Sequence, residues 1–111
     1  MLKVLYAGSP KDSAKTLSIL IEKSKTANFE ICGVLSNPPS AKGRSKALIP
    51  TEVSQVATEN NIPVLEPEHL DGACREEVAK LNPDILVCFA YGHIFGPKFL
   101  SLFKFGGINL H

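Results

Sequence analysis

The sequence is poor in cysteine, and its cysteines are not arranged in pairs. Cys32, Cys74 and Cys88 are odd in number, and no two of them have the C-x-x-C spacing of zinc or redox sites. This pattern argues against a disulfide framework and against a cysteine-based zinc site. We expect three reduced and mostly buried thiols, as in a cytoplasmic protein, and no bound metal.

A strong net charge and long apolar segments are also missing. The 111 residues contain 12 lysines and arginines against 11 aspartates and glutamates, so the total charge indicates neither a nucleic-acid-binding nor a membrane-surface protein. The longest apolar runs are too short to cross a bilayer, and residues 1–4 lack the features of a signal peptide. We therefore expect one small domain with a single core and no membrane association.

The glycine-rich fingerprint of dinucleotide-binding proteins is absent as well. The apolar run Leu2–Ala7 predicts a buried strand, and Gly8 is the only glycine in the turn after it, where G-x-G-x-x-G would need three. Ser9 fits the N-cap of a following helix, Pro10 its first position and Asp12 the return partner of a capping box. Because Pro10 removes one amide donor that an anion would need, capping is the preferred role for Ser9.

Strands and helices alternate along the whole chain. Continuous apolar strands that alternate with helices are typical of a parallel sheet covered on both faces. We therefore expect an α/β fold of the Rossmann-like type, with a doubly wound and mostly parallel sheet. No helix follows the last strand, so we expect the chain to be a fragment of a larger domain. The predicted strands cover residues 2–7, 29–35, 62–65, 85–90 and those after 106–107, and the predicted helices are marked by 14–21, 53–60, 74–81 and 97–103.

The segment 36–50 is a long connection with unbalanced positive charge. It contains three prolines and one glycine together with Lys42, Arg44 and Lys46, and it has no acidic residue. A solvated surface loop is the simpler interpretation of this composition. The alternative is a mobile arm that contacts phosphates, since three cations without a counter-charge attract a polyanion locally.

The segment 89–92, Phe-Ala-Tyr-Gly, leaves the most apolar of the predicted strands. In open α/β sheets, ligands bind at the carboxyl edge where such segments lie. Gly92 permits the close approach of a backbone, whose amides and carbonyls are suited to hydrogen-bond a flat heterocycle. The simpler interpretation is an ordinary strand exit in which Tyr91 packs into the core.

Asn109 and His111 are two residues apart in the last predicted strand, so their side chains point to the same face. The amide of Asn109 donates hydrogen bonds, and the imidazole of His111 donates or transfers a proton. Such a pair at the carboxyl end of a strand suits a reaction that passes through an oxyanion. Asn-x-His alone is a weak signal, and neither His69 nor His93 has a recognisable catalytic or metal-ligand spacing.

Four motifs taken together resemble the methionyl-tRNA formyltransferase family. They occur in the family's order and spacing over the whole chain, and the ordered set is specific although each motif is weak alone. The resemblance implies transfer of a formyl group from 10-formyltetrahydrofolate to the amino group of initiator methionyl-tRNA, without a metal, in the bacterial cytoplasm or an organellar matrix. The motifs are residues 6–10 (Tyr-Ala-Gly-Ser-Pro), 33–38 continuing through 42–46, 90–92 (Ala-Tyr-Gly) and 107–111 (Gly-Ile-Asn-Leu-His).

The resemblance also implies roles for individual residues. Asn109 and His111 match the family's catalytic pair, whose third member, an aspartate further along, is not in this chain. We therefore expect residues 1–111 to be the N-terminal portion of the catalytic domain, without the rest of that domain or a C-terminal domain, and to be inactive alone. The residues implied for the pterin ring of the folate are Phe89, Ala90, Tyr91, Gly92 and Ile94, and those implied for the tRNA acceptor end are Lys42, Arg44 and Lys46.

Other functions stay open beside this one. A formyltransferase that uses the same folate could act on glycinamide ribonucleotide or on a sugar nucleotide, and a non-catalytic nucleotide-binding module is a third alternative. In the glycinamide ribonucleotide enzymes the first loop holds the substrate phosphate with free backbone amides, a task for which Pro10 is poorly suited. The long basic segment also has no purpose with so small a substrate. The sequence leaves the oligomeric state open.

Overall fold

A computed structural model describes residues 1–41 and 47–110 of the chain. Five strands form the main sheet: β1 (Leu2–Ala7), β2 (Phe29–Leu35), β5 (Val64–Leu65), β6 (Ile85–Cys88) and β7 (Gly107–Asn109). Four helices accompany them: α1 (Lys11–Ser24), α2 (Glu52–Glu59), α3 (Gly72–Lys80) and α4 (Pro97–Leu100). The strand order is β5-β2-β1-β6-β7, and all four pairings in this sheet are parallel. The predicted doubly wound, Rossmann-like α/β fold is confirmed.

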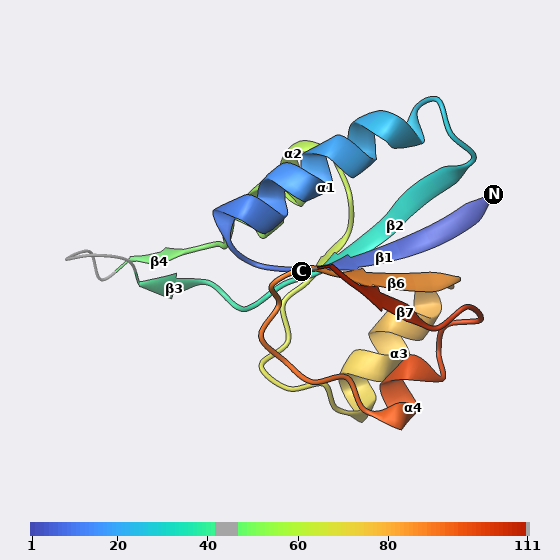
Figure 1. The fold of residues 1–111 in the computed structure, drawn as a ribbon. Coiled ribbons are helices and arrows are strands. Elements are labelled where there is room, and N and C mark those ends of the chain that lie inside the picture. The colour runs from blue at the N-terminus through green and yellow to red at the C-terminus, as the bar shows by residue number, and fades with distance from the viewer. Residues whose placement is uncertain (42–46, 111) are drawn as a thin grey trace.

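The sheet is covered on both faces because its central strand is apolar on both faces. Helices α1 and α2 lie on one side of the sheet, and α3 and α4 lie on the other (Figure 1). Along β1, Val4 and Tyr6 belong to the core beneath α1 and α2, whereas Leu5 and Ala7 belong to the core beneath α3 and α4. This alternation follows from the two-residue period of a strand. Each large apolar side chain buried in this way stabilises the fold by roughly 2 kcal/mol.

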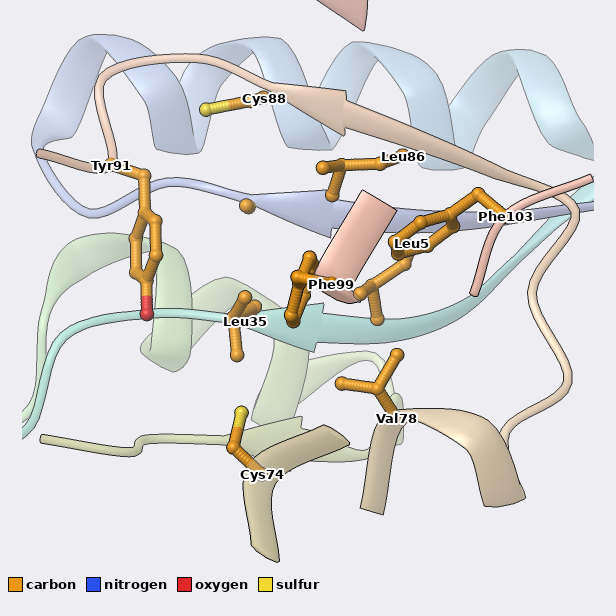
Figure 2. Close-up of a cluster of buried hydrophobic side chains, with 10 residues drawn as sticks. Leu5, Leu35, Cys74, Val78, Leu86, Cys88, Tyr91, Phe99 and Phe103 are labelled. Carbon is orange, nitrogen blue, oxygen red and sulfur yellow. The ribbon is translucent and has the colours of Figure 1, made fainter. Parts of the chain in front are cut away.

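The layer that faces α3 and α4 reaches the carboxyl edge of the sheet. Figure 2 shows Leu5, Leu35 and Leu86 on three neighbouring strands, facing Val78 of α3 and the ring of Phe99 from α4. All five side chains are buried. Their packing fixes α3 and α4 against the sheet, and with them the connections that enter and leave these helices.

Four aromatic rings spaced four residues apart extend this layer toward the sheet edge. Tyr91 stacks on Phe95 with ring centroids 5.6 Å apart, Phe95 on Phe99 at 4.9 Å, and Phe99 lies 5.5 Å from Phe103. Phe99 belongs to the short helix α4, Phe95 and Phe103 flank it, and Tyr91 lies in the loop before the helix. The row of rings therefore continues the packing of the helix into that loop. These contacts anchor the segment between β6 and α4.

The expectation of a long loop over the whole of residues 36–50 is wrong in part. Strands β3 (Ser40–Ala41) and β4 (Leu48–Ile49) pair antiparallel and form the stem of a hairpin that projects away from the main sheet (Figure 1). Two paired residues on each side are too few to give a visible strand pattern in the sequence, which explains the miss. The predicted tRNA residues Lys42, Arg44 and Lys46 lie outside the described residues.

The predicted capping role of Ser9 is also wrong. Helix α1 begins one residue later than expected, with Pro10 as its N-cap and without a side-chain capping bond, so Asp12 closes no capping box. The Ser9 hydroxyl oxygen instead accepts hydrogen bonds from the backbone N–H of Asn37, at 3.2 Å, and from its side-chain amide, at 2.8 Å. Asn37, just after β2, thus offers Ser9 hydrogen-bond donors in place of the N–H groups at the start of α1.

Strand β6 ends at Cys88, two residues before the predicted end at Ala90. Ala90 has a φ of 56°, a left-handed conformation that a strand does not contain. The three cysteines are free, with Cys74 and Cys88 buried and Cys32 partly buried, as expected. Burial raises the pKa of each thiol, so all three are protonated at neutral pH and are poor nucleophiles.

Candidate active site

The carboxyl ends of four strands lie side by side at one edge of the sheet. Ala7 at the end of β1 pairs in register with Leu35 of β2 and with Cys88 of β6, and Cys88 pairs with Asn109 of β7. The segments that leave these strands therefore meet at one place. This is the edge where open α/β sheets bind ligands, and the pairing of Cys88 with Asn109 brings the segment 89–92 next to Asn109.

Two cavities adjoin Asn109 at this edge. Each has a volume of about 360 Å³, and Asn109 and His93 line both. The first is lined by the segment 88–93, so it includes four of the residues implied for the folate, and Ile94 lines the second. A larger cavity of about 550 Å³, beside the outermost strand β5 and helix α3, contains none of the predicted site residues.

The main chain fixes the position of Asn109. It ends β7, whose register with β6 pairs it with Cys88, and the next residue, Leu110, donates its N–H to the Cys88 carbonyl at 2.8 Å. The predicted strand and the place of Asn109 at its carboxyl end are thus confirmed. His111 lies outside the described residues, so its placement on the same face as Asn109 stays a prediction.

Backbone hydrogen bonds hold the loop that follows β6. The N–H of Phe89 donates to the Ala7 carbonyl at 2.9 Å, and the Ala90 carbonyl accepts from the N–H of Ser9 at 3.2 Å. Ala90 and Gly92 have φ values of 56° and 89°, in the left-handed region. For Gly92 this conformation costs little, whereas any side chain there would be strained. The loop is therefore a defined turn and not a flexible strand exit.

The side chains of this loop divide between the core and the cavities. Tyr91, which is only 2% exposed, packs into the core layer of Figure 2, and Phe89 packs against the opposite layer. Ile94, in contrast, is 95% exposed. The loop thus offers a ligand its backbone groups, the open face of Gly92 and the Ile94 side chain, while its two aromatic rings anchor it.

The hydroxyl of Tyr91 is buried and has no hydrogen-bond partner among the described residues. Burial raises the pKa of this phenol far above its usual value, and the nearby thiols of Cys74 and Cys88 raise it further. Tyr91 therefore stays protonated at neutral pH and is unsuited to transfer a proton there. Its role at this edge is structural.

Sequence reasoning missed a polar cluster around Asn37. The side-chain amide of Asn37 donates to the Tyr91 carbonyl and to the Ser9 hydroxyl, both at 2.8 Å. Its carbonyl oxygen lies 2.7 Å from Nε2 of His93, a residue to which the sequence assigned no role. A signal was present, because Asn37 follows the predicted strand 29–35 almost directly, and polar residues there lie at the ligand edge.

The turn after β1 has no free amides for an anion. The N–H of Gly8 donates to the Leu35 carbonyl at 3.0 Å, that of Ser9 donates to Ala90, and Pro10 has none. A Cβ at Gly8 would lie 2.6 Å from the carbonyl oxygen of Phe89, closer than real Cβ contacts. Gly8 therefore serves the close approach of the β1 and β6 exits. Its role here is packing, and the turn is not a phosphate cradle.

Among residues 1–41 and 47–110, no three His, Cys, Asp or Glu side chains are grouped so that they could hold a metal ion. The polar groups beside the two cavities are an amide, an imidazole and main-chain donors and acceptors. Such groups suit hydrogen bonding to a planar ligand and stabilisation of a developing negative charge.

The sequence and the fold both match known formyltransferases. A family model described as formyl transferase matches residues 2–111. The chain belongs to the formyl transferase family. Among curated members, the methionyl-tRNA formyltransferase of Treponema denticola is 38% identical over 99% of this chain, and that of Clostridium acetobutylicum is 38% identical over 100%. The chain spans about a third of the length of these relatives, 35% in each case.

Solved structures of two other formyltransferases share the fold. Phosphoribosylglycinamide formyltransferase from Bacillus halodurans superimposes with a TM-score of 0.72, over 98% of this chain and 55% of that one, at 16% identity. Glycinamide ribonucleotide transformylase 1 from Geobacillus kaustophilus gives a TM-score of 0.71, over 100% of this chain and 58% of that one, at 18% identity. At these identities the likeness establishes the architecture alone.

Proposed function

We propose that residues 1–111 form the N-terminal portion of the catalytic domain of an enzyme that formylates methionyl-tRNA for translation initiation. The formyl donor is 10-formyltetrahydrofolate, and the acceptor is the amino group of the methionyl residue. The observation that carries the proposal is the meeting of Asn109 with the segment 89–94 around the same two cavities. The names and the identity of the curated relatives support the choice of acceptor.

The residues at the cavities fit a folate. A pterin ring is flat and carries hydrogen-bond donors and acceptors on its rim, and the loop 89–92 presents backbone groups beside the open face of Gly92. The second cavity, lined by Leu86, Ile94 and Leu100 among others, offers apolar contact to the remainder of the ligand. When bound, the folate supplies the formyl group.

Asn109 would act on the charge that develops during transfer. When an amine attacks a formyl carbon, negative charge grows on the formyl oxygen, and a positioned amide donor stabilises it. Losing one such donor typically costs about 10²–10³ in rate. We assign to His111 the transfer of the proton that the attacking amine must lose, a role for which an imidazole is suited near neutral pH.

The hairpin formed by β3 and β4 would meet the tRNA. Its stem connects to the carboxyl end of β2 and so begins at the same edge as the proposed folate loop. We assign the contacts with the acceptor end to Lys42, Arg44 and Lys46, because three cations without an acidic neighbour in the segment favour a polyanion. A small phosphorylated acceptor is disfavoured, because Gly8 and Ser9 already use their N–H groups.

We place the activity in the cytoplasm of a bacterium, as the bacterial relatives suggest. No helix within the described ranges is long and apolar enough to cross a membrane.

A chimaera tests the proposal. Residues 1–111 would replace the matching segment of the Treponema denticola enzyme, and formylation of methionyl-tRNA would be measured with 10-formyltetrahydrofolate. We expect activity within about tenfold of the parent enzyme, because the exchanged segment carries its site residues together with the loops that position them. Glycinamide ribonucleotide serves as the competing acceptor. A folded chimaera that binds folate but formylates only the competing acceptor, or neither acceptor, would overturn the proposal.

A further inference from the structure

Asn37 joins three loops that are far apart in the sequence. Its side-chain amide donates to Ser9 in the turn after β1 and to the carbonyl of Tyr91 in the loop after β6. Its side-chain carbonyl oxygen meets Nε2 of His93, in the same loop, at 2.7 Å. Asn37 itself follows β2. One half-buried side chain therefore uses both ends of its amide to connect the exits of β1, β2 and β6.

The chemistry of the contacts fixes how Asn37 and His93 are oriented. The Tyr91 carbonyl only accepts, so the group of Asn37 that faces it must be the NH₂ group. The oxygen of Asn37 then faces His93 and also only accepts, so Nε2 of His93 must carry the donated proton. A flip of the amide would set its oxygen against the Tyr91 carbonyl oxygen, whichever ring nitrogen of His93 carries the proton. Only the unflipped amide therefore satisfies both contacts.

The base of the β3–β4 hairpin is tied to the same cluster. Ser36, next to Asn37, is fully buried and donates its hydroxyl proton to the Gly8 carbonyl at 2.6 Å. Its oxygen lies 2.6 Å from the hydroxyl of Thr51, so Thr51 is the donor in that bond. Thr51 follows the hairpin and caps α2 by accepting from the N–H of Ser54. Both ends of the hairpin are therefore anchored at Ser36, the residue next to Asn37.

We propose that Asn37 is a positioning residue that holds the loop 89–93 in a fixed place relative to the stem of the β3–β4 hairpin. The inference deepens the proposed function, in which the loop receives the folate and the hairpin receives the tRNA. The side chain of Asn37 bonds to Ser9, Tyr91 and His93 and not to Asn109. Removing it should therefore loosen the loop that positions the substrates, while the amide of Asn109 that stabilises the developing charge stays in place. The effect falls on KM for both substrates more than on kcat.

Hydrogen exchange on the ligand-free chain of residues 1–111 tests the tether without relying on the proposed function. In Asn37→Leu, we expect the amides of residues 89–94 to exchange at least about tenfold faster, while the amides of β1 keep their protection. Asn37→Gln keeps both amide functions and restores at least part of the protection. Asn60→Leu is the matched control, because it removes an exposed amide that bonds only to the Val56 carbonyl within and beside α2.

His93 provides an independent variant that cannot fail by unfolding the core, since the residue is exposed. We expect His93→Leu to accelerate amide exchange in the loop 89–94. His93→Gln should retain a hydrogen-bond donor for Asn37 and keep the loop protected. The ¹⁵N spectrum of the wild-type imidazole should show the proton on Nε2. Unchanged exchange of the loop in both Asn37→Leu and His93→Leu would overturn the inference, as would acceleration spread equally over β1.

The effect of Asn37 on KM and kcat is measured in the chimaera described above. We expect Asn37→Leu to raise KM for the folate and for methionyl-tRNA by at least about fivefold each, with kcat within about twofold. A fall in kcat alone would contradict the inference. A chimaera that is inactive before any substitution would refute the proposed function only, since the exchange and tautomer measurements need no ligand.

Discussion

At the scale of the residue, Asn109 is the side chain whose loss the proposed chemistry makes most costly. In the chimaera, Asn109→Ala should lower formyl transfer by about 10²–10³. The dissociation constant of the folate should change little, because the loop 89–94 is left intact. His111→Ala should also lower transfer heavily with near-normal folate binding. Single-turnover formylation with a parallel binding titration separates the two quantities.

Asn60→Ala is the matched control for Asn109→Ala, because it deletes an exposed amide just after α2 that lines neither cavity. It should leave both rate and affinity unchanged. Near-normal turnover in Asn109→Ala would remove this residue from the catalytic assignment.

Tyr91 should make the fold sensitive to alkaline pH. Burial raises its pKa above the usual value near 10, so the folded state holds the phenol proton more tightly than the unfolded state. The associated stability is complete below about pH 10 and is lost as pH rises above that value. In Tyr91→Phe, the fall in the free energy of unfolding between about pH 9 and pH 11 should be smaller by about 1 kcal/mol. Urea unfolding across this range measures the difference.

Tyr6→Phe is the comparison for Tyr91→Phe at neutral pH. The Tyr6 hydroxyl donates to the Ser13 carbonyl at 2.8 Å, so its removal should destabilise the fold by about 1 kcal/mol. The Tyr91 hydroxyl has no partner among the described residues, so its removal should be neutral or stabilising. Equal destabilisation by the two substitutions would contradict the assignment of an unsatisfied hydroxyl.

Gly8 should be intolerant of any side chain. A Cβ there would meet the backbone of the β6 exit and the side chain of Ser13, so Gly8→Ala should destabilise the fold by about 1–3 kcal/mol. Gly96→Ala is the control, because no atom lies within 4 Å of the added carbon. A smaller effect at Gly8 than at Gly96 in urea unfolding would show that the two strand exits are not closely packed.

Among the helices and strands, the sequence predicts those whose positions depend on the local pattern of apolar residues. Strands β1 and β2 begin and end where the apolar runs do, and the helices fall on the predicted apolar stripes. The failures have two causes. Ser9 leaves its predicted cap for donors on Asn37, and Ala90 ends β6 in a left-handed turn whose carbonyl accepts from the N–H of Ser9. Both involve contacts between segments distant in the sequence, which local pattern does not contain. The sequence does not predict the hairpin stem because the stem has only two paired residues on each side.

The basic segment 42–46 should matter for tRNA binding and little for folate binding. Arg44→Ala should weaken methionyl-tRNA binding to the chimaera far more than folate binding, with smaller effects from Lys42→Ala and Lys46→Ala. Each lost phosphate contact should reduce the slope of log affinity against log salt by roughly 0.9 or less. Filter binding over a salt series measures affinity and slope together. If the triple alanine variant binds with unchanged affinity and slope, the segment is only a solvated loop.

At the scale of the whole molecule, the candidate site is assembled from four chain segments. The turn at Gly8–Ser9, the β2 exit at Asn37, the loop 89–94 and Asn109 meet because parallel strands bring their carboxyl ends to one edge. The fold class therefore suffices to predict where the site lies. It does not predict the tether between Asn37 and His93, because which side chains meet across strand exits depends on the turn geometry of each loop.

The same assembly explains why a polypeptide limited to residues 1–111 should not transfer formyl groups. The family resemblance implies a catalytic aspartate besides Asn109 and His111, and the three aspartates of this chain are used elsewhere. Asp84 accepts from the N–H of Lys3 before the start of β6, away from the cavities, and Asp71 caps α3. Asp12 lies in the first turn of α1, and none of the three lines the cavities beside Asn109.

His93 cannot take over the missing function, although it lines both cavities. Its Nε2 proton is committed to Asn37, and no carboxylate is among its hydrogen-bond partners in the described part of the chain. Incubation of the purified polypeptide with 10-formyltetrahydrofolate and methionyl-tRNA should therefore give no product above the uncatalysed background, even when hydrogen exchange shows a protected β1. Weak folate binding to the loop 89–94 is compatible with this result. Formyl-methionyl-tRNA formed above background would show that transfer by Asn109 and His111 needs no aspartate to orient the imidazole.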